Sequence, residues 1–260
     1  MKKKLKPFLD DLVEQYNKPG FIEDDPIGVP HQLHQKADIE IIGFFSAILA
    51  WGQRKTIINK SNDLLKRMEY APYDFIKNCT DLDLQRFESF KHRTFNSTDC
   101  LYFIEFLRFY YQKEESLENA FSQFLSSQDQ DIEKALIGFK ELFFSLDFAP
   151  KRTRKHIASP ASKSTCKRLN MYLRWMVRKD EKGVDFGIWS QISPSQLMMP
   201  LDVHVERVAR KLGLLKRKQR DWKAVQELTS ELRKLDPKDP TKYDFALFGM
   251  GVSERLSPID

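Results

Sequence analysis

Two charged residues carry the side chains that could do chemistry in this chain. Lys167 lies in a basic block, Lys163-Ser-Thr-Cys-Lys-Arg, and Asp202 follows a Pro-Leu pair at the expected start of a helix. A lysine amine can act as a nucleophile, and a carboxylate can stabilise positive charge or transfer a proton. Each residue also has a simpler interpretation: Lys167 as a phosphate contact and Asp202 as an N-cap.

Positive charge is concentrated around both residues. The chain has 260 residues and a formal net charge of +6. Nine Lys/Arg and no Asp/Glu occur from Lys151 to Arg178, and seven Lys/Arg with no acid occur from Arg207 to Arg220. Two such stretches beside one candidate site suit the phosphates of a nucleic acid, although a solvated cationic surface would have the same composition.

The helix expected after Ser159-Pro160 would carry a cationic ridge. If it begins near Thr165, one face shows polar residues at steps of three or four, namely Lys167, Asn170, Arg174 and Arg178. Like charges at this spacing repel, so we expect an anion to lie against this face. The hydroxyl groups before the helix would either bind a phosphate or cap the helix.

The elements that must position these residues are helical. Apolar residues return every three or four positions and no segment alternates like a strand, which predicts an all-α fold. We expect one two-lobed domain over 1–260, with an N-terminal extension over 1–38, a helical lobe over 39–150 and a second half over 151–260. The predicted helices are 39–51, 57–68, 100–111, 117–125, 132–144, 167–177, 203–212, 222–235 and 243–252.

Cysteine and histidine spacing gives no sign of a metal or disulfide. Cys79, Cys100 and Cys166 are odd in number and far apart, and His31 and His34 have no cysteine or carboxylate cluster beside them. No apolar stretch reaches the ~20 residues of a membrane span, and the N-terminus lacks the apolar core of a signal peptide. We therefore expect a soluble, cytoplasmic monomer without a cofactor.

The segment from Lys167 to Leu214 resembles the helix-hairpin-helix DNA glycosylase superfamily. The resemblance rests on Lys-Arg-Leu-Asn-Met-Tyr-Leu-Arg-Trp-Met-Val-Arg and on Pro-Leu-Asp-Val-His-Val-Glu-Arg-Val-Ala-Arg-Lys-Leu-Gly-Leu. The chain also resembles an uncharacterised bacterial family near that superfamily, named only as a domain of unknown function. The spacing from lysine to aspartate is more similar to archaeal 8-oxoguanine glycosylases. Residues 47–60 and 243–251 resemble two further helices of the fold more weakly.

The resemblance implies base-excision repair of DNA by a two-lobed glycosylase-like fold with an atypical helix-hairpin-helix. Lys167 would attack the sugar C1′ of a flipped nucleotide, Asp202 would stabilise the developing positive charge, and a Schiff base would permit strand cleavage. The implied DNA contacts are Gln53, Lys163, Ser164, Thr165, Arg168, Arg174, Arg178, His204 and Arg207. Three tryptophans would either line the base pocket or pack in the core: Trp51, Trp175 and Trp189.

The chain departs from the superfamily pattern at the hairpin. The pattern Leu-Pro-Gly-Val-Gly is replaced by Ser-Pro-Ala-Ser-Lys-Ser-Thr, without the glycines that let a backbone approach a phosphate. The four-cysteine loop of the endonuclease III group is also absent, so we expect no iron-sulfur cluster. One alternative is a non-catalytic nucleic-acid-binding protein on the same scaffold. A second is a helical protein-protein scaffold, which would not bind nucleic acid at modest salt.

Overall fold

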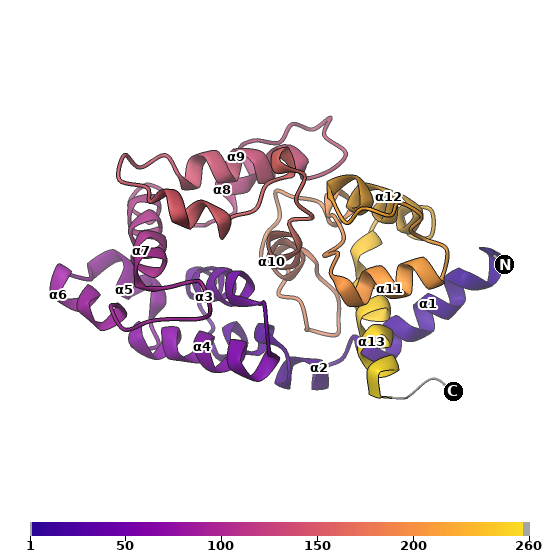
Figure 1. Cartoon of the computed structure of the whole chain (residues 1–260), viewed down its shortest axis with the longest axis horizontal. Helices are drawn as coiled ribbons and strands as arrows, with labels where there is room; N and C mark the ends of the chain where they lie inside the picture. Colours follow the sequence, from indigo (N-terminus) through magenta and orange to yellow (C-terminus); the bar gives the residue numbers. More distant parts are fainter. Residues whose placement is uncertain (1, 257–260) are drawn as a thin grey trace. The chain divides into compact units, whose positions relative to one another are not determined.

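The computed structural model describes the backbone of residues 2–256 and the side chains of residues 4–253, and its fold is all-α (Figure 1). The described residues form no β-strand, and an isolated bridge joins His92 to Phe95. The all-α prediction is therefore confirmed. The chain divides into two compact units: unit 1 comprises 1–21, 126–134 and 159–260, and unit 2 comprises 22–125 and 135–158.

The boundaries of the units differ from the lobes expected from the sequence. The first boundary falls inside α2 (Gly20–Glu23), so the expected extension over 1–38 contributes to both units. Its helix α1 (Lys2–Tyr16) packs against α13 (Tyr243–Leu256) at the other end of the chain. The Tyr16 hydroxyl lies 2.9 Å from Ser253 Oγ, 237 positions away in sequence. Because the partner of α1 is so distant in the sequence, no local pattern in the N-terminal segment predicts that α1 packs against α13.

In unit 1, helix α13 packs against both α1 and α11 (Val203–Lys211), and the three helices are grouped at the right of Figure 1. Two glycines of α13 allow this packing. A Cβ on Gly249 would come within 2.4 Å of the Tyr16 ring, and one on Gly251 would come within 3.0 Å of the His204 Cβ. Side chains at these positions would push the helices apart, so the Phe-Gly-Met-Gly run is a packing feature.

Helix α10 (Lys167–Val177) is the most enclosed helix of the candidate site. Every residue from Leu169 to Val177 is buried, including the polar ones. Unit 1 is completed by α12 (Trp222–Arg233), which Asp221 caps by accepting the Ala224 N–H at 3.1 Å, and by short 3-10 turns at Pro160–Ser162, Pro194–Gln196 and Pro240–Lys242. Helices α10 to α13 begin at the residues predicted from apolar periodicity, and at α11 and α12 an aspartate cap coincides with the start.

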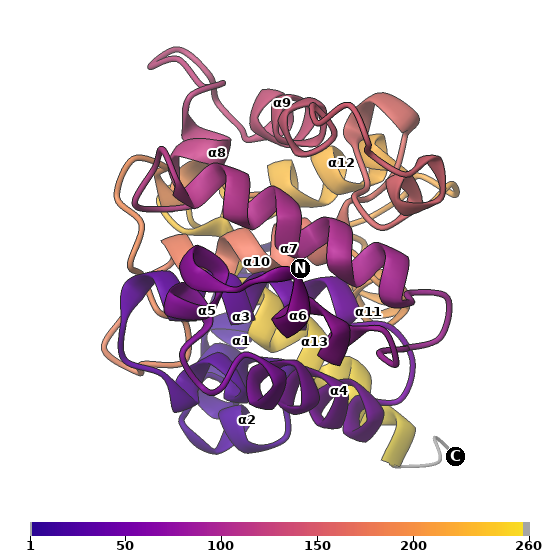
Figure 2. The ribbon, with the colours of Figure 1, turned by 90° about the vertical axis from the view of Figure 1, so that its left-hand side faces the viewer.

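Unit 2 is built on a cluster of buried phenylalanines, and Figure 2 looks onto its helices α6 and α7. The Phe106 and Phe143 ring centroids are 4.4 Å apart, and those of Phe103 and Phe143 are 4.7 Å apart. Aromatic pairs at these separations add to the burial of apolar area. The helices of this unit are α3 (Lys36–Leu49), α4 (Arg54–Arg67), α5 (Pro72–Asn78), α6 (Asp81–Leu84), α7 (Ser97–Tyr111), α8 (Asn119–Ser122) and α9 (Glu133–Phe143), with 3-10 turns at Pro26–Gly28, Pro30–Gln32, Gln85–Phe87 and Lys151–Lys155.

A buried carboxylate joins α3 to the segment after α7. Glu40 is 0% exposed. Its oxygens accept hydrogen bonds from Tyr111 Oη at 2.8 Å, Ser116 Oγ at 2.5 Å and the Leu117 N–H at 3.0 Å. A buried carboxylate is costly unless donors surround it, and these three donors offset that cost.

The described residues were also compared with the requirements of a membrane span and of a metal site. In the part of the chain that the structure describes, no helix is long and apolar enough to cross a membrane, and no group of three or more His, Cys, Asp or Glu side chains is placed to hold a metal ion.

Cys79, Cys100 and Cys166 are all buried. Burial raises the pKa of the Cys79 and Cys100 thiols, which makes their thiolate forms scarce at neutral pH.

We predict that Glu40→Gln lowers the free energy of unfolding by about 1–3 kcal/mol, because the amide NH2 would face hydroxyl and amide donors. Glu40→Ala should cost about 3 kcal/mol or more, since two buried donors and the half-buried Ser116 hydroxyl lose their acceptor. Urea denaturation followed by circular dichroism measures both. The exposed residue Glu115 provides the control, and Glu115→Gln should change stability by less than about 0.5 kcal/mol. Equal effects at Glu40 and Glu115 would contradict the prediction.

Candidate functional site

Lys167 is the first residue of α10 and follows a loop with two left-handed residues. Lys163 has φ 60° and Cys166, the N-cap of α10, has φ 51°. Residues other than glycine rarely take this conformation. The helix therefore begins at Lys167, the first residue of the predicted range 167–177, and not two residues earlier at Thr165, because the left-handed Cys166 interrupts the helical backbone.

The first turn of α10 lacks the usual features of a helix start. The Cys166 side chain makes no capping hydrogen bond, and the turn contains Lys167 and Arg168 but no acidic residue. Cations at this end oppose the helix dipole, and uncapped N–H groups favour an anion. By contrast, α7, α11 and α12 are capped by asparagine or aspartate side chains.

Asp202 is the N-cap of α11. Its Oδ1 accepts the N–H groups of His204 at 2.9 Å and Val205 at 3.0 Å. The N-cap interpretation of this residue is confirmed. Capping fixes the position of the half-buried carboxylate, and both of these bonds use the same carboxylate oxygen.

Asn170 connects the segment before Lys167 to the segment before Asp202. Its side chain is fully buried, and Nδ2 donates to the Thr165 carbonyl at 3.1 Å and to the Met199 carbonyl at 3.5 Å. Thr165 stands two positions before Lys167, and Met199 stands three positions before Asp202. One amide therefore restrains both backbones that carry the candidate catalytic residues. The sequence placed Asn170 on the cationic face without indicating this role.

The expected cationic ridge is wrong for its C-terminal half. Arg174 and Arg178 are each 3% exposed. Arg174 Nε lies 3.2 Å from Asp185 Oδ1, and Arg178 Nη1 lies 3.1 Å from Asp185 Oδ2. Together the two guanidiniums pair with four carboxylates, those of Asp180, Asp185, Asp239 and Asp244. These arginines hold unit 1 together and have no exposed surface for DNA.

Asp244 is a residue of this site that the sequence did not reveal. It is the second residue of α13 and is 6% exposed. Its Oδ2 pairs with Arg174, and its Oδ1 is buried without a hydrogen-bond partner among the described residues. Burial raises the pKa of this carboxyl to about 6, against the lowering effect of Arg174. The Asp202 carboxylate also raises it and Lys167 lowers it, so both candidate catalytic residues act electrostatically on Asp244.

The predicted DNA contacts around the start of α10 differ in exposure. Lys163 is exposed, and Ser164 and Thr165 are half-buried. Ser164 Oγ accepts the Cys166 N–H at 3.2 Å. Arg168 is half-buried, and burial lowers its pKa to about 10. All four residues stand within four positions of Lys167 in the sequence, at the start of α10.

The two predicted contacts on α11 interact with α13. The His204 ring packs against Phe248 with centroids 5.8 Å apart, and its Nδ1 lies 3.4 Å from the Gly251 carbonyl oxygen. Arg207 donates from Nη2 to the same carbonyl at 2.5 Å. These contacts favour packing and capping roles for both side chains.

The tryptophans fall into two groups. Trp175 and Trp189 are buried in unit 1, and Trp189 meets Tyr172 edge-on at 5.4 Å. Their burial favours the core interpretation. Trp51 of unit 2 is half-buried, with the Arg93 guanidinium 4.7 Å from its ring centroid.

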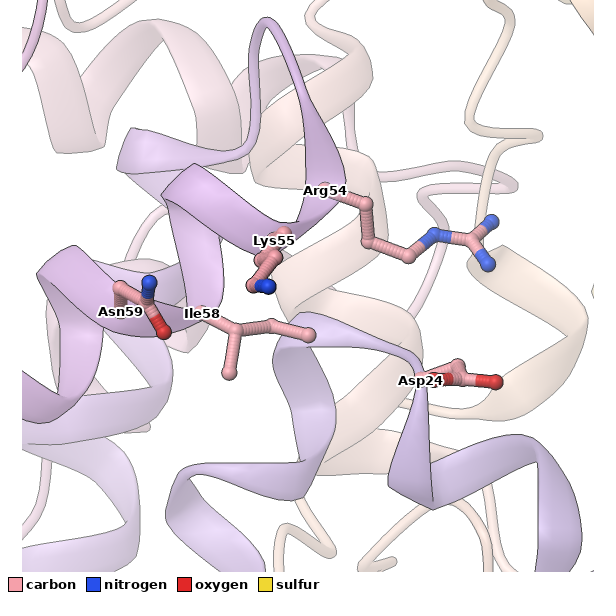
Figure 3. Close-up of a pocket in the computed structure, with 5 residues that line it drawn as sticks. All are labelled: Asp24, Arg54, Lys55, Ile58 and Asn59. Atoms are coloured by element: carbon pink, nitrogen blue, oxygen red, sulfur yellow. The ribbon is translucent and has the colours of Figure 1, made fainter.

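Unit 2 has an open pocket of about 420 Å³ beside the start of α4. It is lined by Asp24, Arg54, Lys55, Ile58 and Asn59 (Figure 3). Figure 3 shows the charged ends of Arg54 and Asp24 extending toward the same side.

The start of α4 shares its unusual features with the start of α10. Gln53, the exposed N-cap of α4, makes no capping hydrogen bond. The first turn contains Arg54 and Lys55 and no acidic residue. This second helix start is therefore also electrostatically suited to an anion.

We predict that Arg174→Met destabilises the protein by about 3–5 kcal/mol, because Asp185 and Asp244 would stay buried without this cation. The control is Arg220→Met, which removes an exposed pair with Glu206 and should cost less than about 1 kcal/mol. Urea denaturation compares the two variants. If Arg174 instead bound DNA at the surface, its substitution would weaken DNA binding and leave stability unchanged.

We predict that Lys163→Gly stabilises the protein by up to about 1 kcal/mol, because glycine takes a left-handed φ without strain. The backbone carbonyl of Lys163 accepts the Trp222 N–H at 3.2 Å, and glycine would keep this hydrogen bond. Lys223→Gly is the matched control, since it places glycine inside α12 and should destabilise by about 1 kcal/mol. Thermal unfolding should shift in opposite directions for the two variants. A loss of stability in Lys163→Gly would contradict the strain argument.

Comparisons with known proteins identify a family. No curated protein and no solved structure matches the chain. A family model described as "protein of unknown function (DUF2400)" matches residues 25–253, a range that contains Lys167, Asp202 and Asp244. The expectation of an uncharacterised family is thereby confirmed: the chain belongs to the DUF2400 family of proteins of unknown function.

Proposed function

We propose that this chain is a DNA glycosylase of base-excision repair that removes a damaged base and also cleaves the strand through a Schiff base on Lys167. One observation carries the proposal. Within one compact unit, the Asn170 amide donates to the Thr165 carbonyl just before Lys167 and to the Met199 carbonyl just before Asp202, so it joins the two segments that carry these residues. The resemblance to the helix-hairpin-helix glycosylases gives the two residues their roles.

The proposed reaction needs an amine and a carboxylate. Lys167 Nζ forms a bond to the sugar C1′ as the bond from C1′ to the base breaks, and the base leaves with the bonding electrons. The Asp202 carboxylate stabilises the positive charge that develops on the sugar. Loss of the amine protons and opening of the sugar ring give a Schiff base, from which elimination releases the 3′ phosphate.

The uncapped helix starts support a phosphate-binding surface in each unit. In unit 1, Lys163, Lys167 and Arg168 surround the start of α10. In unit 2, Arg54 and Lys55 surround the start of α4. A DNA backbone would satisfy N–H groups and relieve repulsion among cations at both places.

A non-catalytic nucleic-acid-binding protein is the second candidate. The hairpin favours it, because Ala161 and Lys163 stand at the positions of the two pattern glycines, and a side chain keeps a phosphate further from the backbone than glycine does. If the chain is such a non-catalytic protein, Lys167 contacts phosphate and Asp202 only caps α11. Left-handed backbone at Lys163 favours the glycosylase, since the residue aligns with the second glycine of Leu-Pro-Gly-Val-Gly.

We predict a borohydride-trapped covalent complex with duplex DNA that contains 8-oxoguanine, uracil, alkylated adenine or an abasic site. Lys167→Ala should abolish the complex, because no other residue of the site supplies the proposed amine. Asp202→Asn should slow base release by about 10²–10⁴-fold, while asparagine still caps α11. Lys238→Ala, at an exposed lysine outside both basic stretches and both helix starts, is the control that should retain trapping.

Each outcome separates the candidates. Salt-sensitive binding without trapping on any duplex, including the abasic one, would support the non-catalytic protein. Trapping that persists in Lys167→Ala would contradict the assigned nucleophile. Absence of any binding at modest salt would contradict both candidates.

A further inference from the structure

Phe148 is an exposed aromatic residue in the segment that follows α9. Its side chain is 62% exposed, whereas Phe143 and Phe144 just before it are buried. A single exposed apolar side chain is common on protein surfaces, so exposure alone indicates no function. The residues beside Phe148 decide whether this surface suits a ligand.

Cations without a partner lie close to Phe148 in the sequence. Residues 144–155 contain four Lys/Arg and one acidic residue, Asp147. One of the four, Arg152, is paired with Asp99. The other three are exposed and form no ion pair with a described residue: Lys151, Arg154 and Lys155. Positive charge is therefore available to an anion at this place.

Buried contacts hold the 3-10 turn Lys151–Lys155 in position. Arg152 Nη1 lies 2.6 Å from Asp99 Oδ2, and the Thr153 hydroxyl donates to Asp99 Oδ1 at 2.8 Å. Asp99 is fully buried in the first turn of α7, where it forms a capping box with Asn96. The turn is thus fixed on α7, and a ligand that binds its exposed cations has little backbone to order.

Phe148 and Arg154 contact the same pair of stacked rings. The rings of Tyr102 in α7 and Phe144 after α9 have centroids 5.7 Å apart and planes 5° apart. Phe148 meets Tyr102 edge-on with centroids 6.1 Å apart, and the Arg154 guanidinium lies 4.9 Å from the Phe144 centroid. The stacked pair therefore supports an exposed ring and an exposed guanidinium at one place on unit 2.

We propose that this place on unit 2 is a binding surface for single-stranded nucleic acid. The Phe148 surface comprises Phe148, Lys151, Arg154 and Lys155. A base stacks on the exposed ring, and phosphates lie against the three cations. The faces of a base in a duplex are covered by the neighbouring bases, so an exposed ring favours an unpaired strand. The inference does not depend on a reaction at Lys167, which belongs to unit 1.

The first test separates stacking from charge. Fluorescence anisotropy would compare a short oligothymidylate with a strand of tetrahydrofuran abasic residues, which has the same phosphates but no bases and cannot form a Schiff base. Phe148→Ala should weaken binding of the oligothymidylate by about 5- to 100-fold, the loss expected for one stacked base, and should leave the abasic strand unaffected. Unaltered binding of the abasic strand also shows that the variant is folded.

Two further variants and a control define the aromatic contribution. Phe148→Trp should retain binding of the oligothymidylate, because tryptophan also offers a flat face to a base. Phe148→Leu should weaken it, because leucine is apolar but has no such face. Phe8→Ala removes an exposed phenylalanine of α1 in unit 1, 43% exposed, and should change neither strand.

The second test measures the phosphate contacts. Arg154→Gln and Lys155→Gln should each weaken binding of both strands and reduce the slope of log affinity against log salt by about 0.7, the value of one contact to a single strand. Lys66→Gln, at an exposed lysine in the last turn of α4, should leave the slope unchanged.

Three results would overturn the inference. Equal losses on both strands in Phe148→Ala would mean that the ring contacts no base. A salt slope that neither Arg154→Gln nor Lys155→Gln alters would mean that the cations contact no phosphate. Binding of anionic lipid vesicles or of an acidic peptide that Phe148→Ala weakens, with binding of the oligothymidylate unaltered, would assign the surface to another partner.

The tests distinguish this inference from the proposed function. Binding of the oligothymidylate that depends on Phe148, with no borohydride trapping by the wild-type chain, would support the surface and reject the lyase. Trapping that depends on Lys167, with binding of the oligothymidylate unaltered in Phe148→Ala, would support the lyase and reject the surface.

Discussion

Burial of two arginines on α10 is the constraint on which unit 1 depends. Arg174 and Arg178 lie inside the protein, where an unpaired guanidinium is highly unfavourable. Their carboxylate partners come from the segment after α10, from the turn before α13 and from α13 itself. Pairing therefore fixes α13 against α10, and the glycines of α13 let α1 and α11 pack against it.

The same constraint shapes the candidate site. Lys167 lies two helical turns before Arg174, at the half-buried end of the helix face that carries the buried charges. Asp202 is held by capping α11, and α11 packs against α13. Asp244 belongs both to the stabilising pairs and to the surroundings of Lys167 and Asp202.

The acid-free stretch around α10 shows how a local charge pattern can mislead. From Lys151 to Arg178 no acidic residue occurs, which suggested an exposed cationic surface. Arg174 nevertheless pairs with Asp244, 70 positions further along the chain. Composition within a window cannot report a partner outside it, and burial depends on all the elements packed around a side chain. The exposed side chains of Lys163 and of Lys55 at the start of α4 remain consistent with the original interpretation.

The sequence by itself determined the all-α class and the starts of α10 to α13, and it gave the N-cap role of Asp202 as one of two interpretations. These features depend on apolar periodicity and on hydrogen bonds between residues a few positions apart. A short segment of the sequence is therefore enough to predict them. Only the tertiary structure decided that Arg174 and Arg178 are buried, that α1 belongs with α13, and that Asp244 joins the candidate site. The physical reason is that burial and charge pairing are set by contacts between residues far apart in the chain.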